Sequence, residues 1–214
     1  MEMIDGRTKG ARAAGFGLSL AVVVGCGGRA TAELLTGWNF DNVESGSLVV
    51  DATIGGGVLD LGSLQSVSTT FQGTTLNALD TWDAGEALAF AGAPPEGGGM
   101  TFSLFDVVGP IDVSFAARRS ETGARWVDAE LWDGWGWVPM TTFDITTEWA
   151  VHAVEIDAVP ENGRLFVRLT PAGTTSSGGT IRFDNLRVDG VVPAPGGLAL
   201  AAFGVGLRRR RRHE

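Results

Sequence analysis

The sequence predicts an all-β fold: a two-sheet antiparallel β-sandwich of the jelly-roll-like kind. Short segments rich in Val, Phe, Thr, Ile and Trp alternate apolar and polar residues. Between residues 33 and 190 no stretch keeps the i, i+3, i+4, i+7 apolar spacing of an amphipathic helix. The 32 glycines gather in connections such as "IGGG" and "PPEGGGM". Without helical crossovers the strands must pair antiparallel in two packed layers.

The pattern predicts eleven strands within one domain that spans residues 33–190. In chain order they cover residues 34–40, 47–53, 57–62, 87–91, 100–108, 111–118, 125–132, 135–143, 150–157, 164–170 and 180–188. Residues 63–84 are the least strand-like part and are predicted to form a long loop or an irregular edge.

Residues 1–32 are typical of a signal peptide with a short hydrophobic helix. Three basic residues precede an apolar run at residues 13–25, and Ala30-Thr31-Ala32 offers a cleavage site for signal peptidase. A buried N-terminal helix is the alternative, but the charge order, the run length and the small-residue ending together favour export.

The single cysteine leaves the mature N-terminus open between two interpretations. The sequence "VVGC" ending at Cys26 resembles a lipoprotein box, in which this cysteine is acylated. The strand pattern begins immediately after Ala32 and leaves little room for a tether, which favours cleavage after Ala32. In that case the mature chain has no cysteine, and disulfide or thiol chemistry is excluded.

The body is strongly acidic. Residues 33–192 contain 22 Asp and Glu against seven Arg and no Lys, a formal charge of −15. Such a surface repels phosphate backbones, so we expect no nucleic-acid partner.

The segment "RWVDAELWDGWGWVPM" at residues 125–140 predicts a hairpin. Asp133-Gly134 is typical of a two-residue turn, which pairs Trp132 with Trp135 and Glu130 with Trp137. Alternation then places Val127, Ala129, Leu131 and Val138 on the core face. The other face receives Trp126, Asp128, Glu130, Trp132, Trp135 and Trp137.

Two interpretations of this Trp-rich face remain open. Flat indoles stack on sugar rings and carboxylates accept hydroxyl hydrogen bonds, so the face fits a polysaccharide. Cross-strand Trp pairs also stabilise hairpins on their own, and the loop at residues 63–84 could fold over them. Structural packing is the favoured interpretation.

The last strand, "TIRFDNLRVDG", changes its alternation across Asp184 and Asn185, which predicts a bulge. Together with Asp41 in "WNFDN", these residues supply oxygen atoms suited to one Ca²⁺ ion. The alternative is that their side chains satisfy local backbone donors.

No motif for an enzyme emerges from the sequence. A phosphate-binding Gly loop, a nucleophile elbow and a Cys/His cluster are absent. His152 is the one histidine of the body, and a strand histidine is usually structural. Asp128 and Glu130 form a carboxylate pair of the kind glycosidases use, but an acidic surface produces such pairs by chance. We expect no catalysis and no cofactor other than calcium.

The C-terminal residues 191–214 end in "VPAPGGLALAAFGVGLRRRRRHE". The apolar run at residues 196–207 has 12 residues, short of the roughly 20 that span a bilayer. An arginine cluster after it would stay on the cytoplasmic side. This segment is predicted to contact the membrane as a short hydrophobic helix, transiently or as an anchor.

This tail resembles the PEP-CTERM class of bacterial sorting signals: a Pro-x-Pro motif, a short apolar helix and a terminal Arg cluster. The "VPAPG" form is similar to a variant found in planctomycete proteins, with Ala194 where the class usually has Glu. The resemblance implies processing by an exosortase-like protease and delivery to the cell surface. The matching residues are Pro193, Ala194, Pro195, Arg208, Arg209, Arg210, Arg211 and Arg212.

The body is similar to concanavalin-like or carbohydrate-binding-module-like jelly rolls in its opening "GWNFDN", its central "DGWGW" and its closing "IRFDNLRVDG". The sequence therefore predicts an exported, surface-sorted, non-enzymatic protein of the bacterial envelope or extracellular matrix. A glycan-binding module is the alternative.

Overall fold

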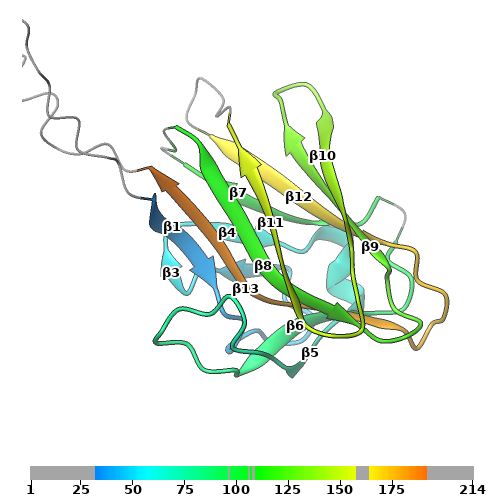
Figure 1. The fold of residues 1–214 in the computed structure, drawn as a ribbon. Helices are drawn as coiled ribbons and strands as arrows, with labels where there is room; N and C mark the ends of the chain where they lie inside the picture. The colour runs from blue at the N-terminus through cyan, green and yellow to red at the C-terminus, as the bar shows by residue number, and fades with distance from the viewer. Residues whose placement is uncertain (1–31, 96, 106, 108, 158–163, 192–214) are drawn as a thin grey trace, which may run out of the picture.

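The computed structural model describes residues 32–95, 97–105, 107, 109–157 and 164–191, and its strands confirm the predicted sandwich of two antiparallel sheets (Figure 1). Sheet A has the order β11-β8-β13-β1-β3, with β6 beside the first half of β13 and β5 beside β6. Its strands are β1 (Ala32–Trp38), β3 (Ile54–Gly55), β5 (Ser68–Gln72), β6 (Glu86–Ala91), β8 (Ile111–Arg119), β11 (Ala150–Ile156) and β13 (Thr180–Val191).

Sheet B has the order β10-β9-β12-β7-β4-β2. Its strands are β2 (Val49–Asp51), β4 (Val58–Asp60), β7 (Met100–Leu104), β9 (Trp126–Trp132), β10 (Trp137–Asp144) and β12 (Leu165–Ala172). One 3-10 helix, η1 (Gly62–Val67), precedes β5. No helix among the described residues is long and apolar enough to cross a membrane.

The core lies between the sheets, where alternate residues of facing strands meet. Sheet B contributes Phe102, Val127 and Leu169, all without solvent exposure. The inner faces of sheet A meet them with Phe115 and Phe183, whose ring centroids lie 5.7 Å apart. Alternation therefore assigns the faces of the long strands correctly, because burial on one side is what selects apolar residues at every second position.

The boundaries of the shorter elements differ from the predictions. The pattern misses β3, which has two residues, and the predicted strand at 100–108 ends at Leu104. The segment 63–84 is not a plain loop, because it contains most of η1 and all of β5, which adds to the edge of sheet A beside β6. The segment buries Leu64 and Trp82.

The predicted two-residue turn of the β9–β10 hairpin is wrong. Trp132 pairs with Trp137, and four residues, Asp133–Gly136, form the loop. The Asp133 carboxylate accepts hydrogen bonds from the backbone N–H groups of Trp135 (2.8 Å) and Gly136 (2.9 Å), which lengthens the turn. These bonds also lower the pKa of Asp133.

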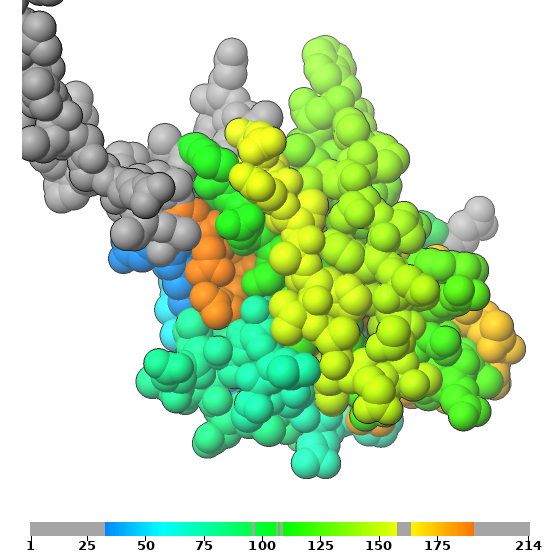
Figure 2. Space-filling model, in the orientation of Figure 1, coloured from blue at the N-terminus to red at the C-terminus, as the bar shows by residue number. Residues whose placement is uncertain are grey.

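The longer turn moves two residues away from their predicted positions. Trp135 lies in the loop and is 94% exposed, instead of on the sheet face. Val138 pairs with Leu131 but is 44% exposed and so does not join the core. The tip of this hairpin projects beyond the body of the sandwich (Figures 1 and 2).

The predicted bulge in β13 is confirmed, with a register shift between Asp184 and Arg187. The bulge holds the loop at residues 73–85 against sheet A. The Asn185 side-chain amide donates to the carbonyls of Thr74 (2.7 Å) and Leu76 (2.9 Å), and Asn77 donates back to the Asn185 carbonyl (2.8 Å). The loop thus packs on sheet A and does not cover the Trp-rich hairpin of sheet B.

Candidate functional site

The outer face of sheet B brings together most of the Trp-rich set. From β9 it receives Trp126, Asp128, Glu130 and Trp132, because their neighbours Val127 and Ala129 are buried. Trp137 joins them from β10, opposite Trp132. Trp126 and Trp132 are six residues apart in one strand, about 20 Å at 3.3 Å per residue.

Trp132 and Trp137 form an aromatic pair at the outer end of this face. Their ring centroids are 5.5 Å apart and their planes meet at 67°, an edge-to-face contact. The Arg168 guanidinium carbon lies 4.4 Å from the Trp137 ring centroid. Both rings are half-buried by these contacts, so they combine a structural role with partial exposure.

The Glu130 carboxylate is held in place by β12. Arg168 Nε donates to Glu130 Oε2 at 2.7 Å, and Thr170 Oγ1 lies 3.3 Å from the same oxygen. The side chains of Arg168 and Glu130 are 23% and 17% exposed. Arg168 therefore links the carboxylate to the Trp pair and fixes both.

A hollow of about 370 Å³ lies beside this ion pair. Asp128 Oδ1 accepts a hydrogen bond from Thr142 Oγ1 at 2.5 Å across the hairpin. The hollow is lined by Gly97, Asp128, Glu130, Pro139, Thr141, Thr142, Arg168 and Thr170. Its hydroxyl, carboxylate and guanidinium groups can both donate to and accept from a ligand rich in hydroxyl groups.

Sequence reasoning missed the contribution of β12. Phe166, Arg168 and Thr170 alternate with the buried Leu165, Val167 and Leu169, so their outward direction was visible in the sequence. The sequence pattern did not show that these residues lie beside β9, because the pairing joins residues 38 positions apart, as for Arg168 and Glu130.

The three residues predicted for calcium lie near one another, at the neck of the 73–85 loop. Asp184 is buried, and its oxygens accept from the N–H groups of Thr74 (2.6 Å) and Asn185 (2.8 Å). Asp41 accepts from Glu86 N–H at 2.8 Å and from the Asn39 amide at 2.7 Å. The alternative of local backbone donors is therefore also realised.

Burial raises the pKa of Asp184 to about 7, and the nearby Asp41 carboxylate adds to the rise. Two glycines allow the backbone of the 73–85 loop to approach the Asp184 and Asp41 carboxylates closely. A Cβ at Gly73 would overlap Asp184 Oδ2, and a Cβ at Gly85 would overlap Asp41 Oδ1. Since Gly73 donates to the Gly85 carbonyl at 3.0 Å, both carboxylates flank the point where the loop closes.

One buried oxygen in this cluster has no partner among the described residues. Asn185 Oδ1 accepts no hydrogen bond from them, although Asn185 has no solvent exposure. Within the described residues no group of three or more His, Cys, Asp or Glu side chains gathers in metal-binding geometry. A cation here would thus depend on two carboxylates and an amide oxygen, an all-oxygen set of the type that Ca²⁺ prefers.

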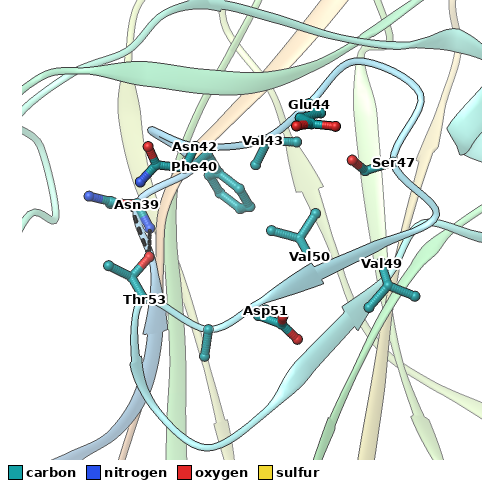
Figure 3. A pocket seen from close by; sticks show the side chains of 11 residues that line it. Asn39, Phe40, Asn42, Val43, Glu44, Ser47, Val49, Val50, Asp51 and Thr53 are labelled. Carbon is teal, nitrogen blue, oxygen red and sulfur yellow. Dashed lines mark hydrogen bonds between the residues drawn. The ribbon is translucent and has the colours of Figure 1, made fainter.

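A second hollow, of about 500 Å³, opens at the opposite edge of sheet B, beside β2 (Figure 3). Phe40, Val43 and Val50 form its apolar part, and Thr53 donates to Asn39 Oδ1 at 2.9 Å on its wall. Phe40 is 2% exposed, so this hollow offers no ring for stacking. The outer face of sheet B is the stronger candidate for a saccharide.

His152, which the sequence predicts to be structural, packs against two phenylalanines. Its ring lies 5.6 Å from Phe115 and 5.3 Å from Phe143 by centroid, and burial lowers its pKa. The predicted signal peptide with Cys26 and the tail with its Pro-x-Pro motif and arginines lie outside the described residues.

No family model matches the chain, and no curated protein matches it significantly. Solved structures that resemble it include the CBM22-1 xylan-binding domain of Paenibacillus barcinonensis Xyn10C, at 13% identity and a TM-score of 0.47, over 78% of this chain and all of that one. TmCBM61 in complex with β-1,4-galactotriose resembles it at 14% identity and a TM-score of 0.40, over 62% of this chain and 86% of that one.

The carbohydrate-binding module CBM36 in complex with calcium and xylotriose is similar at 14% identity and a TM-score of 0.36, over 56% of this chain and 87% of that one. Since these scores all lie below 0.5, the fold assignment rests on the strand topology described above.

Proposed function

We propose that the sandwich is a non-catalytic glycan-binding domain and that the outer face of sheet B is its binding surface. The observation that carries this proposal is the Trp132–Trp137 pair beside a hollow lined with hydroxyl and carboxylate groups. A saccharide needs both kinds of contact, since its ring faces are apolar and its edges carry hydroxyl groups.

The fixed geometry of the face supports binding. Arg168 holds Glu130 and stacks on Trp137, so neither side chain must be ordered when a ligand arrives. Side chains that are immobile before binding lose less entropy on association. The acidic body favours neutral sugars over anionic ones at this face.

Affinity electrophoresis through gels that contain xylan or β-1,4-galactan tests the proposal. We expect retardation of the wild-type body that Trp132→Ala abolishes. Trp135→Ala is the matched control, because Trp135 is 94% exposed at the hairpin tip and lies off the sheet face. Absence of retardation on a broad panel of neutral polysaccharides, or equal loss in both variants, would overturn it.

The absence of catalysis is part of the proposal. Asp128 accepts a hydrogen bond from Thr142, and Glu130 accepts one from Arg168. The two carboxylates are therefore engaged separately and are not arranged around one glycosidic bond. Incubation with the same polysaccharides should release no new reducing ends. Reducing ends that disappear with Asp128→Asn or Glu130→Gln would show a glycosidase instead.

We further propose that the protein is exported and sorted to the envelope or extracellular matrix by its two ends. The supporting observations are the signal peptide pattern and the Pro-x-Pro, apolar and Arg series of residues 192–214. Deletion of residues 192–214 followed by cell fractionation tests this. An unchanged location of the body would contradict it.

A calcium ion at the neck of the 73–85 loop is a second proposal. Asp41, Asp184 and Asn185 Oδ1 would hold it, and the unpartnered Asn185 oxygen is the observation that favours it. The ion would tie the loop to β13. Thermal unfolding in CaCl₂, MgCl₂ and EGTA tests this: a rise in Tm specific to calcium that Asp184→Asn removes supports the site, and an unchanged Tm contradicts it.

A further inference from the structure

The outer face of sheet A carries two arginines side by side. Arg118 of β8 and Arg182 of β13 are direct partners in the antiparallel register, and the buried neighbours Ala117 and Phe183 show that both point outward. Figure 1 shows β8 and β13 side by side in sheet A. Like charges directly opposite each other in a sheet are destabilising.

No carboxylate compensates this pair among the described residues. Arg125, Arg168 and Arg187 form ion pairs within the described residues. Arg119 donates to three backbone carbonyls. Arg118 and Arg182 have neither an ion pair nor a hydrogen bond within the described part of the chain, although the body carries 22 acidic residues.

The neighbouring groups do not neutralise the positive charges of Arg118 and Arg182. Asp184 follows Arg182 by two residues, but its oxygens accept from Thr74 and Asn185 instead. Burial lowers the pKa of Arg182, and the positive charge of Arg118 lowers it further. The site therefore concentrates positive charge on a body whose net charge is strongly negative, and an anion would relieve the repulsion.

An aromatic ring contacts Arg182, and a second aromatic residue follows from the register at the Arg118 end. The Arg182 guanidinium carbon lies 4.3 Å from the Phe71 ring centroid, and Phe71 is 38% exposed. On the other side, the half-buried Trp149 immediately precedes Ala150, which pairs with Ala117, so Trp149 lies at the Arg118 end of β8. Rings next to a cation offer stacking surface as well as charge.

We propose that Arg118 and Arg182 bind the carboxylate or sulfate group of an acidic polysaccharide. Two adjacent guanidinium groups match the planar, bidentate geometry of an oxyanion. The partly exposed Phe71 ring beside Arg182 favours a sugar as its carrier, because a sugar ring has an apolar face that can lie on an aromatic ring. This site lies on the sheet opposite the Trp132–Trp137 face and does not depend on the function proposed there.

Affinity electrophoresis with polygalacturonate and dextran sulfate tests the proposal, with neutral dextran and polyglutamate as comparison polymers. We expect retardation by the acidic polysaccharides, weaker as salt rises from 50 to 300 mM. Arg118→Gln should weaken binding by at least tenfold, as loss of a charge-assisted hydrogen bond implies. It should not lower Tm, because Arg118 makes no ion pair within the described residues and opposes a like charge.

Matched variants separate this site from general charge and from sheet B. Arg125→Gln changes the net charge equally but lies elsewhere, in an ion pair with Asp144, and should retain binding. Trp132→Ala should also retain it. The proposal is overturned if acidic polysaccharides do not bind, if Arg125→Gln or Trp132→Ala weakens binding as much as Arg118→Gln, or if polyglutamate binds equally well.

Discussion

Asn185 gives the sharpest test of how the 73–85 loop is held to sheet A. Its amide donates to the carbonyls of Thr74 and Leu76, and its φ of 48° lies in the left-handed region. Substitution to Gly removes the two hydrogen bonds but tolerates the backbone angle. Substitution to Ala removes the bonds and adds strain at a positive φ.

The expected losses follow from these contacts. Each of the two hydrogen bonds contributes about 1 kcal/mol net, and a partly buried carbonyl left without a donor costs up to about 3 kcal/mol. Asn185→Gly should therefore lower the free energy of unfolding by about 2–4 kcal/mol. Asn185→Ala should lower it by about 1 kcal/mol more, for the left-handed backbone. Both are large against a typical total of about 5–15 kcal/mol.

Urea unfolding followed by Trp fluorescence measures these losses. Asn42→Ala is the control, since Asn42 is exposed and makes no hydrogen bond within the described residues. It should cost less than about 0.5 kcal/mol. Losses at Asn185 as small as this control would show that the loop is not held by β13. Equal losses for the Gly and Ala variants would show that the left-handed angle is not required.

Other predictions follow from single contacts. Gly85→Ala should cost more than about 2 kcal/mol in urea unfolding, because the new Cβ overlaps Asp41 and φ is positive. Burial lowers the pKa of His152, so the unfolded state binds the proton first as pH falls below about 6.5. Tm should fall between pH 8 and pH 5 more in the wild type than in His152→Phe. In a double-mutant cycle, Arg168→Met and Glu130→Gln should couple by about 1–2 kcal/mol, as for a partly buried ion pair. Finally, calcium should raise Tm at pH 8 and not at pH 5, since the Asp184 pKa of about 7 makes protons compete with the ion.

Alternation was sufficient to predict the faces of the long strands. It assigned Trp126, Asp128 and Glu130 to the outer face of β9 and Val127 and Ala129 to the core, as the structure has them. This works because a strand between core and solvent exposes every second residue to the same environment.

In the β9–β10 hairpin, the Asp133-Gly134 signal predicts the wrong register but the correct face for Trp137. Asp-Gly predicts a two-residue turn, but the Asp133 side chain binds the N–H groups of Trp135 and Gly136 and extends the loop to four residues. The register of β10 shifts by two positions, and two is the period of a strand. Trp137 therefore stays on the predicted face, and Trp135 leaves it.

Contacts between distant segments were beyond the sequence pattern. Arg168 reaches Glu130 across the β9–β12 pair, and Asn185 reaches Thr74 over a separation of 111 residues. The irregular pattern of residues 63–84 has the same cause, because four hydrogen bonds that hold the 73–85 loop join it to β13, more than 100 positions away in the sequence.

The arginines of the body divide between the two sheets in a way that bears on ligand choice. On sheet B, Arg168 is neutralised by Glu130, so the Trp-rich face has little net positive charge to attract an anion. On sheet A, Arg118 and Arg182 are not neutralised within the described residues. In a body of charge −15, the net field repels an acidic polymer, and such a pair reduces that repulsion locally. In a polysaccharide with neutral and acidic stretches, the neutral stretches would thus bind the outer face of sheet B and the acidic stretches the arginine pair of sheet A. The Trp132→Ala and Arg118→Gln variants are therefore independent tests of the two sites.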